Sequence, residues 1–85
     1  MSANERLAWT IDVFDEATER LVEEHELAGV TVEKLREIFG QPESEPMVDS
    51  FRVSEAQAHA LQPFLSNPLQ IASGRSYFLQ CHSTN

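Results

Sequence analysis

The chain has 85 residues, of which 14 are acidic and 6 are basic, so its formal net charge is −8. A chain of this length forms one domain with a small core, which leaves most of its chemistry at the surface. The negative charge disfavours binding to nucleic acid or to anionic lipid and favours basic protein surfaces.

The first predicted element is a strand over residues 7–13, where every odd position is apolar and the even positions are mostly polar. A period of two is typical of a strand with one buried face. Residues 15–18 can turn the chain. The segment 18–28 stays open between helix and strand, because its composition favours a helix but its apolar residues form only a thin helical stripe.

Two short helices are predicted from their caps. Thr31 is a good N-cap and Gly40 a good C′ residue for the first helix, and apolar residues recur between them at helical spacing. Ser54 and Gln57 are spaced as a capping box at the start of the second helix. Pro63 should bend or end that helix, because it removes a backbone donor.

A third strand is predicted over residues 47–53 and a last strand over 76–81. The chain ends, residues 1–6 and 82–85, are expected to fray. The whole chain is therefore expected to be a single α+β domain in the order β-β-α-β-α-β. Its four-stranded sheet, antiparallel or mixed, should carry both helices on one face.

The sequence offers no constellation of catalytic or metal-ligating residues. His25, His59 and His82 share no ligand spacing with one another, and a structural zinc site needs about four ligands. The carboxylate pairs fall on faces that should be solvated, and no glycine-rich loop is present. We therefore expect no enzymatic activity, no cofactor and no metal.

One cysteine, Cys81, excludes an internal disulfide and fits a reducing compartment. The first residues lack the basic and apolar regions of a signal peptide. No run approaches the ~18–20 apolar residues that span a bilayer. A cytoplasmic location is expected.

The acidic residues are concentrated in one half of the chain. Residues 1–49 hold 13 acids and 4 bases, whereas residues 50–85 hold 1 acid and 2 bases. Clustered charge speeds the encounter with an oppositely charged partner and orients it. The candidate partner-binding residues are Asp12, Asp15, Glu16, Glu19, Glu24, Glu26, Glu33, Glu37, Glu43 and Glu45.

Short pieces of the sequence resemble a family of small acidic bacterial proteins of unknown function, similar to the immunity proteins of toxin–immunity loci. The resemblance implies a hairpin for residues 7–28 and transfers no catalytic residue. The pieces that carry it are Phe14-Asp15, Thr18, Leu21-Val22, Leu27, Leu35, Ile38-Phe39-Gly40, Pro46-Met47, Val53-Ser54, Gln57-Ala58, Leu61, and Tyr77-Phe78-Leu79 with Cys81.

The leading functional hypothesis is an immunity protein that binds and neutralises a bacterial toxin, a nuclease in particular, through its acidic surface. Toxins that act on nucleic acid have basic clefts, which an acidic domain can occupy. The first alternative is a non-catalytic regulatory or structural module that forms a homo-oligomer through an exposed strand edge. The second alternative is an acidic mimic of nucleic acid, which would bind many unrelated basic proteins.

Overall fold

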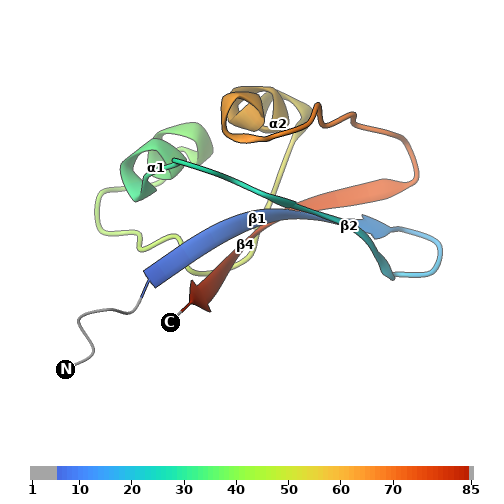
Figure 1. Ribbon diagram of the computed structural model, residues 1–85, viewed down its shortest axis with the longest axis horizontal. Coiled ribbons are helices and arrows are strands. Elements are labelled where there is room, and N and C mark those ends of the chain that lie inside the picture. The colour runs from blue at the N-terminus through green and yellow to red at the C-terminus, as the bar shows by residue number, and fades with distance from the viewer. Residues whose placement is uncertain (1–5, 85) are drawn as a thin grey trace.

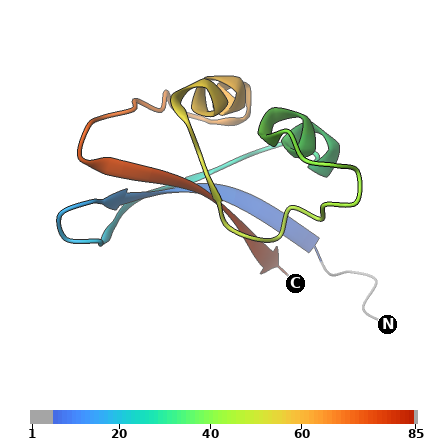
Figure 2. The same cartoon turned by 180° about the vertical axis from the view of Figure 1, so that it is seen from behind.

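The computed structural model describes residues 6–84, which form a four-stranded antiparallel sheet and two helices. The strand order is β2-β1-β4-β3, and both helices lie on the same side of the sheet (Figures 1 and 2). The predicted α+β fold class is confirmed. The elements are β1 (Arg6–Asp15), β2 (Leu21–Glu26), α1 (Val32–Phe39), β3 (Phe51–Arg52), α2 (Glu55–Leu61), the 3-10 turn η1 (Gln62–Phe64) and β4 (Arg75–Thr84).

β1 is the central long strand, because it pairs with β2 on one side and along its whole length with β4 on the other. Its odd residues Trp9, Ile11 and Val13 are at most 8% exposed and pack against the helices. Leu35 of α1 and Leu61 of α2 are fully buried in the same core. The prediction that the odd residues of β1 face the core is confirmed for these three, whereas Leu7 is 45% exposed.

The open question in residues 18–28 is settled in favour of a strand, because Leu21–Glu26 form β2 and pair with β1 in an antiparallel hairpin. Asp15 builds the turn: its Oδ1 accepts hydrogen bonds from the backbone N–H groups of Ala17 and Thr18 at 2.8 and 3.1 Å. Glu19 adopts a left-handed conformation with φ 60°. These local contacts explain why residues of helical composition reverse the chain here and continue as a strand.

Both helices begin and end where their caps predict. The Thr31 hydroxyl accepts from the Lys34 amide at 3.1 Å, and Gly40 ends α1 in the left-handed region with φ 64°. Ser54 and Gln57 form both bonds of the capping box. Pro63 lies in η1, directly after α2. Within residues 6–84, neither helix has the length and apolar content needed to cross a bilayer.

The last two strands differ in length from their predictions. β3 keeps only two residues of the predicted strand 47–53. β4 is longer than predicted, because residues 82–84 pair with residues 6–8 of β1 and so do not fray. A fully extended central strand gives this terminal segment a pairing partner. The fraying expected for residues 1–5 and 85 lies outside the described residues.

Met47 explains why the segment before β3 is not a strand. Its backbone is left-handed, with φ 59°, although its side chain is fully buried. Two contacts hold this conformation: Trp9 Nε1 donates to the Met47 carbonyl at 2.8 Å, and the Met47 amide donates to Glu45 Oε2 at 3.1 Å. A conformation that is unfavourable for a non-glycine residue persists because the core and these bonds fix it.

Replacing Trp9 by Phe should therefore destabilise the protein by about 1–3 kcal/mol, because a buried carbonyl loses its donor. Urea denaturation of W9F and wild type measures the difference. Val48, which is 46% exposed beside Met47, gives a matched control: V48A should change stability by less than about 0.5 kcal/mol. Equal stability of W9F and wild type would show that this bond does not fix the loop.

Candidate functional site

The sheet has one face that no helix covers, and we call it the open face. Side chains alternate along a strand, so residues that lie between the buried ones point to this face. The two views in Figures 1 and 2 show helices on the opposite side only. The open face is formed by Ala8, Thr10, Asp12 and Phe14 of β1, Glu24 and Glu26 of β2, and Ser76, Phe78, Gln80 and His82 of β4.

Two polar residues in the middle of the open face are nevertheless buried. Thr10 is 6% exposed and Asp12 is 7% exposed. Asp12 lies between Glu24 on β2 and Phe78 on β4, so longer side chains on both sides shield it. The Thr10 hydroxyl donates a 2.8 Å hydrogen bond to Asp12 Oδ1. Asp12 was predicted as a partner-binding residue, and its carboxylate is shielded by its neighbours in the chain on its own.

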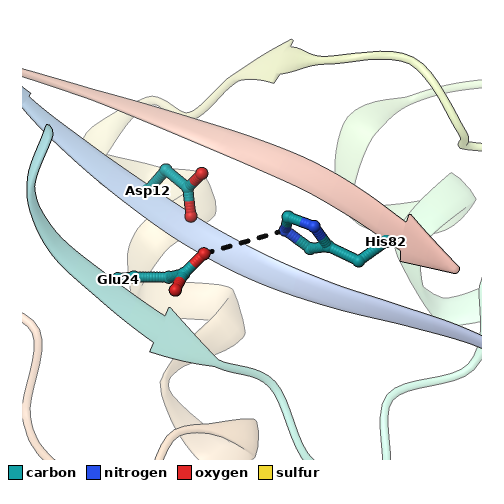
Figure 3. A group of neighbouring side chains, drawn as sticks. All are labelled: Asp12, Glu24 and His82. Carbon is teal, nitrogen blue, oxygen red and sulfur yellow. Dashed lines mark ion pairs between the residues drawn. The ribbon is translucent and has the colours of Figure 1, made fainter. Parts of the chain in front are cut away.

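Asp12, Glu24 and His82 converge from three neighbouring strands (Figure 3). One carboxylate oxygen of Asp12, one of Glu24 and one ring nitrogen of His82 all lie within 4.8 Å of one another. His82 Nε2 is 3.8 Å from Glu24 Oε2 and 3.0 Å from Thr10 Oγ1. In the part of the chain that the structure describes, this is the one group of three that could hold a metal ion. A hollow of about 320 Å³ adjoins it, lined by Ala8, Trp9, Thr10, Glu24, Glu26, Leu27 and His82.

At the other end of the open face lies a shallow aromatic groove of about 340 Å³. Phe14 and Phe78 meet edge to face, with ring centroids 5.9 Å apart. The Arg52 guanidinium lies 5.6 Å from the centroid of the Phe78 ring. Partly exposed aromatic rings of this kind are common anchors in protein interfaces. The groove is lined by Phe14, Asp15, Glu19, Ser50, Ser76, Phe78 and Gln80.

The ten predicted acidic residues do not form one surface. Six gather on the open face and at its hairpin end, where Glu19 lines the aromatic groove and Glu16 accepts from Ser76 Oγ at 2.9 Å. The helix layer and the loop after α1 hold the rest. The first group is Asp12, Asp15, Glu16, Glu19, Glu24 and Glu26, and the second group is Glu33, Glu37, Glu43 and Glu45.

Some of these carboxylates already serve the fold. Asp15 caps the hairpin turn and Glu45 binds the Met47 amide. By contrast, the exposed carboxylates of Glu19 and Glu26 have no hydrogen-bond or ion-pair partner among residues 6–84. Such groups are available to an incoming basic surface.

A separate charged cluster lies at the hairpin end on the helix side of the sheet. Glu23 contacts His25 Nε2 at 2.8 Å and Arg75 at 2.9 Å. The hydrogen bond with His25 lowers the pKa of Glu23 below its usual value, burial opposes this in part, and the charges of His25 and Arg75 add to the lowering. This cluster ties β2 to β4 across β1, which is a structural role.

Cys81 belongs to the core side of β4 and not to the open face. It is half-buried and packs against the core cluster. Burial raises the pKa of its thiol, so the thiol stays protonated and weakly nucleophilic at neutral pH. This environment is typical of a structural cysteine and not of a nucleophile.

Sequence reasoning missed the two features that the open face assembles. Phe14 and Phe78 are 64 positions apart in the sequence, and so no local pattern joins them. Asp12, Glu24 and His82 come together only through the register of β1 with both of its neighbours. A correct prediction of how β2 and β4 pair with β1 would have indicated both the aromatic groove and the Asp12–Glu24–His82 cluster.

Residues 8–80 match the family model described as "Domain of unknown function (DUF7683)". No curated protein and no solved structure matches the chain.

Replacing Glu23 by Gln should lower the free energy of unfolding at neutral pH by at most about 1 kcal/mol, because the ion pairs of Glu23 with His25 and Arg75 are largely solvated. The folded-state pKa of Glu23 lies below its ordinary 4.5. Its ionised form therefore stabilises the fold above that pH, and this contribution is lost as the pH falls through the folded-state pKa. Denaturant unfolding should show that the difference in stability between E23Q and the wild type is smaller at acidic pH than at neutral pH. E43Q, in the exposed loop, is the control, and a difference independent of pH would contradict the assignment.

Proposed function

We propose that this protein, which belongs to the DUF7683 family of domains of unknown function, binds a basic protein partner through its open face. In the specific form of the proposal, the partner is a bacterial toxin of the nuclease type and the chain is its immunity protein. The protein acts by binding and not by catalysis. The observation that carries the proposal is a sheet face left uncovered by either helix, where carboxylates border the partly exposed rings of Phe14 and Phe78.

The chemistry of the open face suits a protein partner. Its acidic end presents Glu24 and Glu26, which are exposed on the outermost strand β2. Its other end presents the aromatic groove, with Glu19 at the rim. Charged groups of one sign accelerate the encounter with a basic surface and orient it. Apolar anchors such as Phe14 and Phe78 then supply the buried contacts on which affinity depends.

Strand β2 adds a second mode of contact. It forms one edge of the sheet, so its outer backbone groups are available to pair with a strand of another protein. Glu24 and Glu26 would repel a second copy of β2 approaching the same edge and attract a basic strand. The charge on this edge therefore favours a foreign basic partner over self-association.

Inhibition follows from the shape of such a complex. A nuclease carries a cleft of positive charge for its substrate. An acidic face seated on that cleft excludes the nucleic acid, with no chemical step required of this chain. The resemblance of the sequence to immunity-type proteins supports this form of the proposal. The proposed binding takes place in the cytoplasm, where the single thiol of Cys81 remains reduced.

The direct test measures binding to a panel of purified basic nuclease-toxin domains at low and moderate salt. One selective, tight partner is expected. The variant in which Glu16, Glu19, Glu24 and Glu26 are all replaced by Gln should then associate at least about tenfold more slowly at low salt, because steering is lost. Surface plasmon resonance or biolayer interferometry gives the rates.

The matched control replaces four acids outside the open face, Glu33, Glu37, Glu43 and Glu55, by Gln. Both variants lose the same charge, so only its position differs. The control should associate nearly as fast as the wild type. Equal slowing of both variants would contradict a localised site. Salt-sensitive binding to every basic domain would favour the mimic of nucleic acid, and self-association without a partner would favour the homo-oligomeric module.

A further inference from the structure

We propose that Asp12, Glu24 and His82 bind one divalent transition-metal ion of the zinc type. The ion would lie on the same open face as the protein partner proposed above and would share Glu24 with it, but a metal titration tests the site without that partner. Two carboxylates and one imidazole form the donor set, and each comes from a different strand (Figure 3). Imidazole suits Zn²⁺ and similar ions better than Mg²⁺ or Ca²⁺, and carboxylates accept the same ions.

The register of the sheet places the three donors together. Asp12 on β1 is directly opposite Glu24 on β2. His82 on β4 is opposite Ala8, whose small side chain leaves room for the ring. The ring extends over Thr10, and its Nε2 atom lies 3.0 Å from the Thr10 hydroxyl. Three adjacent strands therefore direct their donors at one point on the open face.

Asp12 is the fixed member of the site. It is 7% exposed, and the Thr10 hydroxyl holds its Oδ1 at 2.8 Å. Thr10 is the one hydrogen-bond donor to this carboxylate within residues 6–84, so Oδ2 is available to an ion. A hydrogen bond of this kind orients a metal ligand. Thr10 is thus a positioning residue for the proposed ion.

Glu24 and His82 can complete the coordination by small rotations. Four ligand atoms around a zinc ion lie roughly 3.4 Å from one another, given bonds of about 2.0–2.2 Å. The donors here lie within 4.8 Å. The side chains of His82 and Glu24 are 44% and 49% exposed, so they can rotate to bring their ligand atoms to the shorter distance that zinc requires. A water molecule from the adjoining hollow would supply the fourth ligand.

The two carboxylates of the cluster favour the binding of a cation. Like charges directly opposite on neighbouring strands are destabilising, and burial of a carboxylate adds to the cost. No Lys or Arg side chain of the described residues forms an ion pair with Asp12 or Glu24. Among residues 6–84, His82 is the one basic side chain for which an ion pair with Glu24 is formed, at 3.8 Å. A divalent ion would offset both carboxylates.

The alternative without metal is a chain of hydrogen bonds. In this arrangement the Thr10 hydroxyl donates its hydrogen bond to Asp12. His82 Nε2 then carries a proton and donates a hydrogen bond to the Thr10 oxygen. A metal ion would replace the proton on Nε2 and use the same lone pair. The two states therefore compete for one nitrogen atom, and a metal titration distinguishes them.

The experiment uses the untagged chain, stripped with a chelator and dialysed, and titrates Zn²⁺ near neutral pH by calorimetry. Co²⁺ is titrated in parallel, because its visible absorption reports the ligand set. One ion per chain is expected. E24Q and H82A should each weaken Zn²⁺ binding at least about tenfold, the lower range for loss of groups that support a metal site. Because both residues are exposed, neither change should prevent folding.

Two matched variants control for charge and for histidine. E26Q removes a carboxylate from the same strand and face, and H59A removes an exposed histidine on α2; both should bind Zn²⁺ like the wild type. The bound ion should also raise the melting temperature of the wild type and not that of H82A. No stoichiometric binding would overturn the proposal. So would equal losses in E26Q and E24Q, or binding of Mg²⁺ and Ca²⁺ in preference to Zn²⁺.

Discussion

The alternation of side chains along β1 decides which residues of the sheet enter the core and which reach the open face. β1 pairs with both long neighbours, so its register sets which residues of β2 and β4 meet on each face. Its odd residues enter the core beneath α1 and α2, and its even residues form the middle of the open face. A slip of one residue would exchange the two sets, which would expose Ile11 and bury Asp12 under the helices.

The same alternation separates the structural from the available acidic residues. Glu23, on the helix side, is bound by His25 and Arg75 and ties the sheet together. Glu24, the next residue, points to the open face and joins Asp12 and His82. Adjacent glutamates therefore have different roles, and the difference follows from the period of two in a strand. A surface built in this way can be acidic without weakening the core behind it.

Local chemistry made much of the fold predictable. The caps at Thr31 and Ser54 give both helix starts, because a cap is a contact between residues three positions apart. The segment 18–28 could not be assigned from composition, since its strand form depends on the Asp15 turn and on pairing with β1. Met47 was also beyond a local pattern, because its left-handed backbone is held by Trp9, 38 positions away.

The candidate site was less predictable than the fold, because it depends on strand register between distant segments. Charge alone suggested ten acids as partner-binding residues. The sheet brings six of them together, whereas Glu33 and Glu37 lie on α1. The Phe14–Phe78 groove and the approach of His82 to Asp12 both require the pairing of β1 with β4. A histidine with no neighbouring ligand in the sequence therefore gave no sign of the cluster it joins.

We propose that the protein binds its partner through the open face. The most direct measurement is an NMR titration of the labelled chain with the toxin domain that binds it most tightly. If the open face binds the partner, the largest shifts will fall on that face and on the β2 edge, at Phe14, Phe78, Glu24 and Glu26, and α1 and α2 will stay unperturbed. Shifts confined to the two helices, with the open face unchanged, would contradict it.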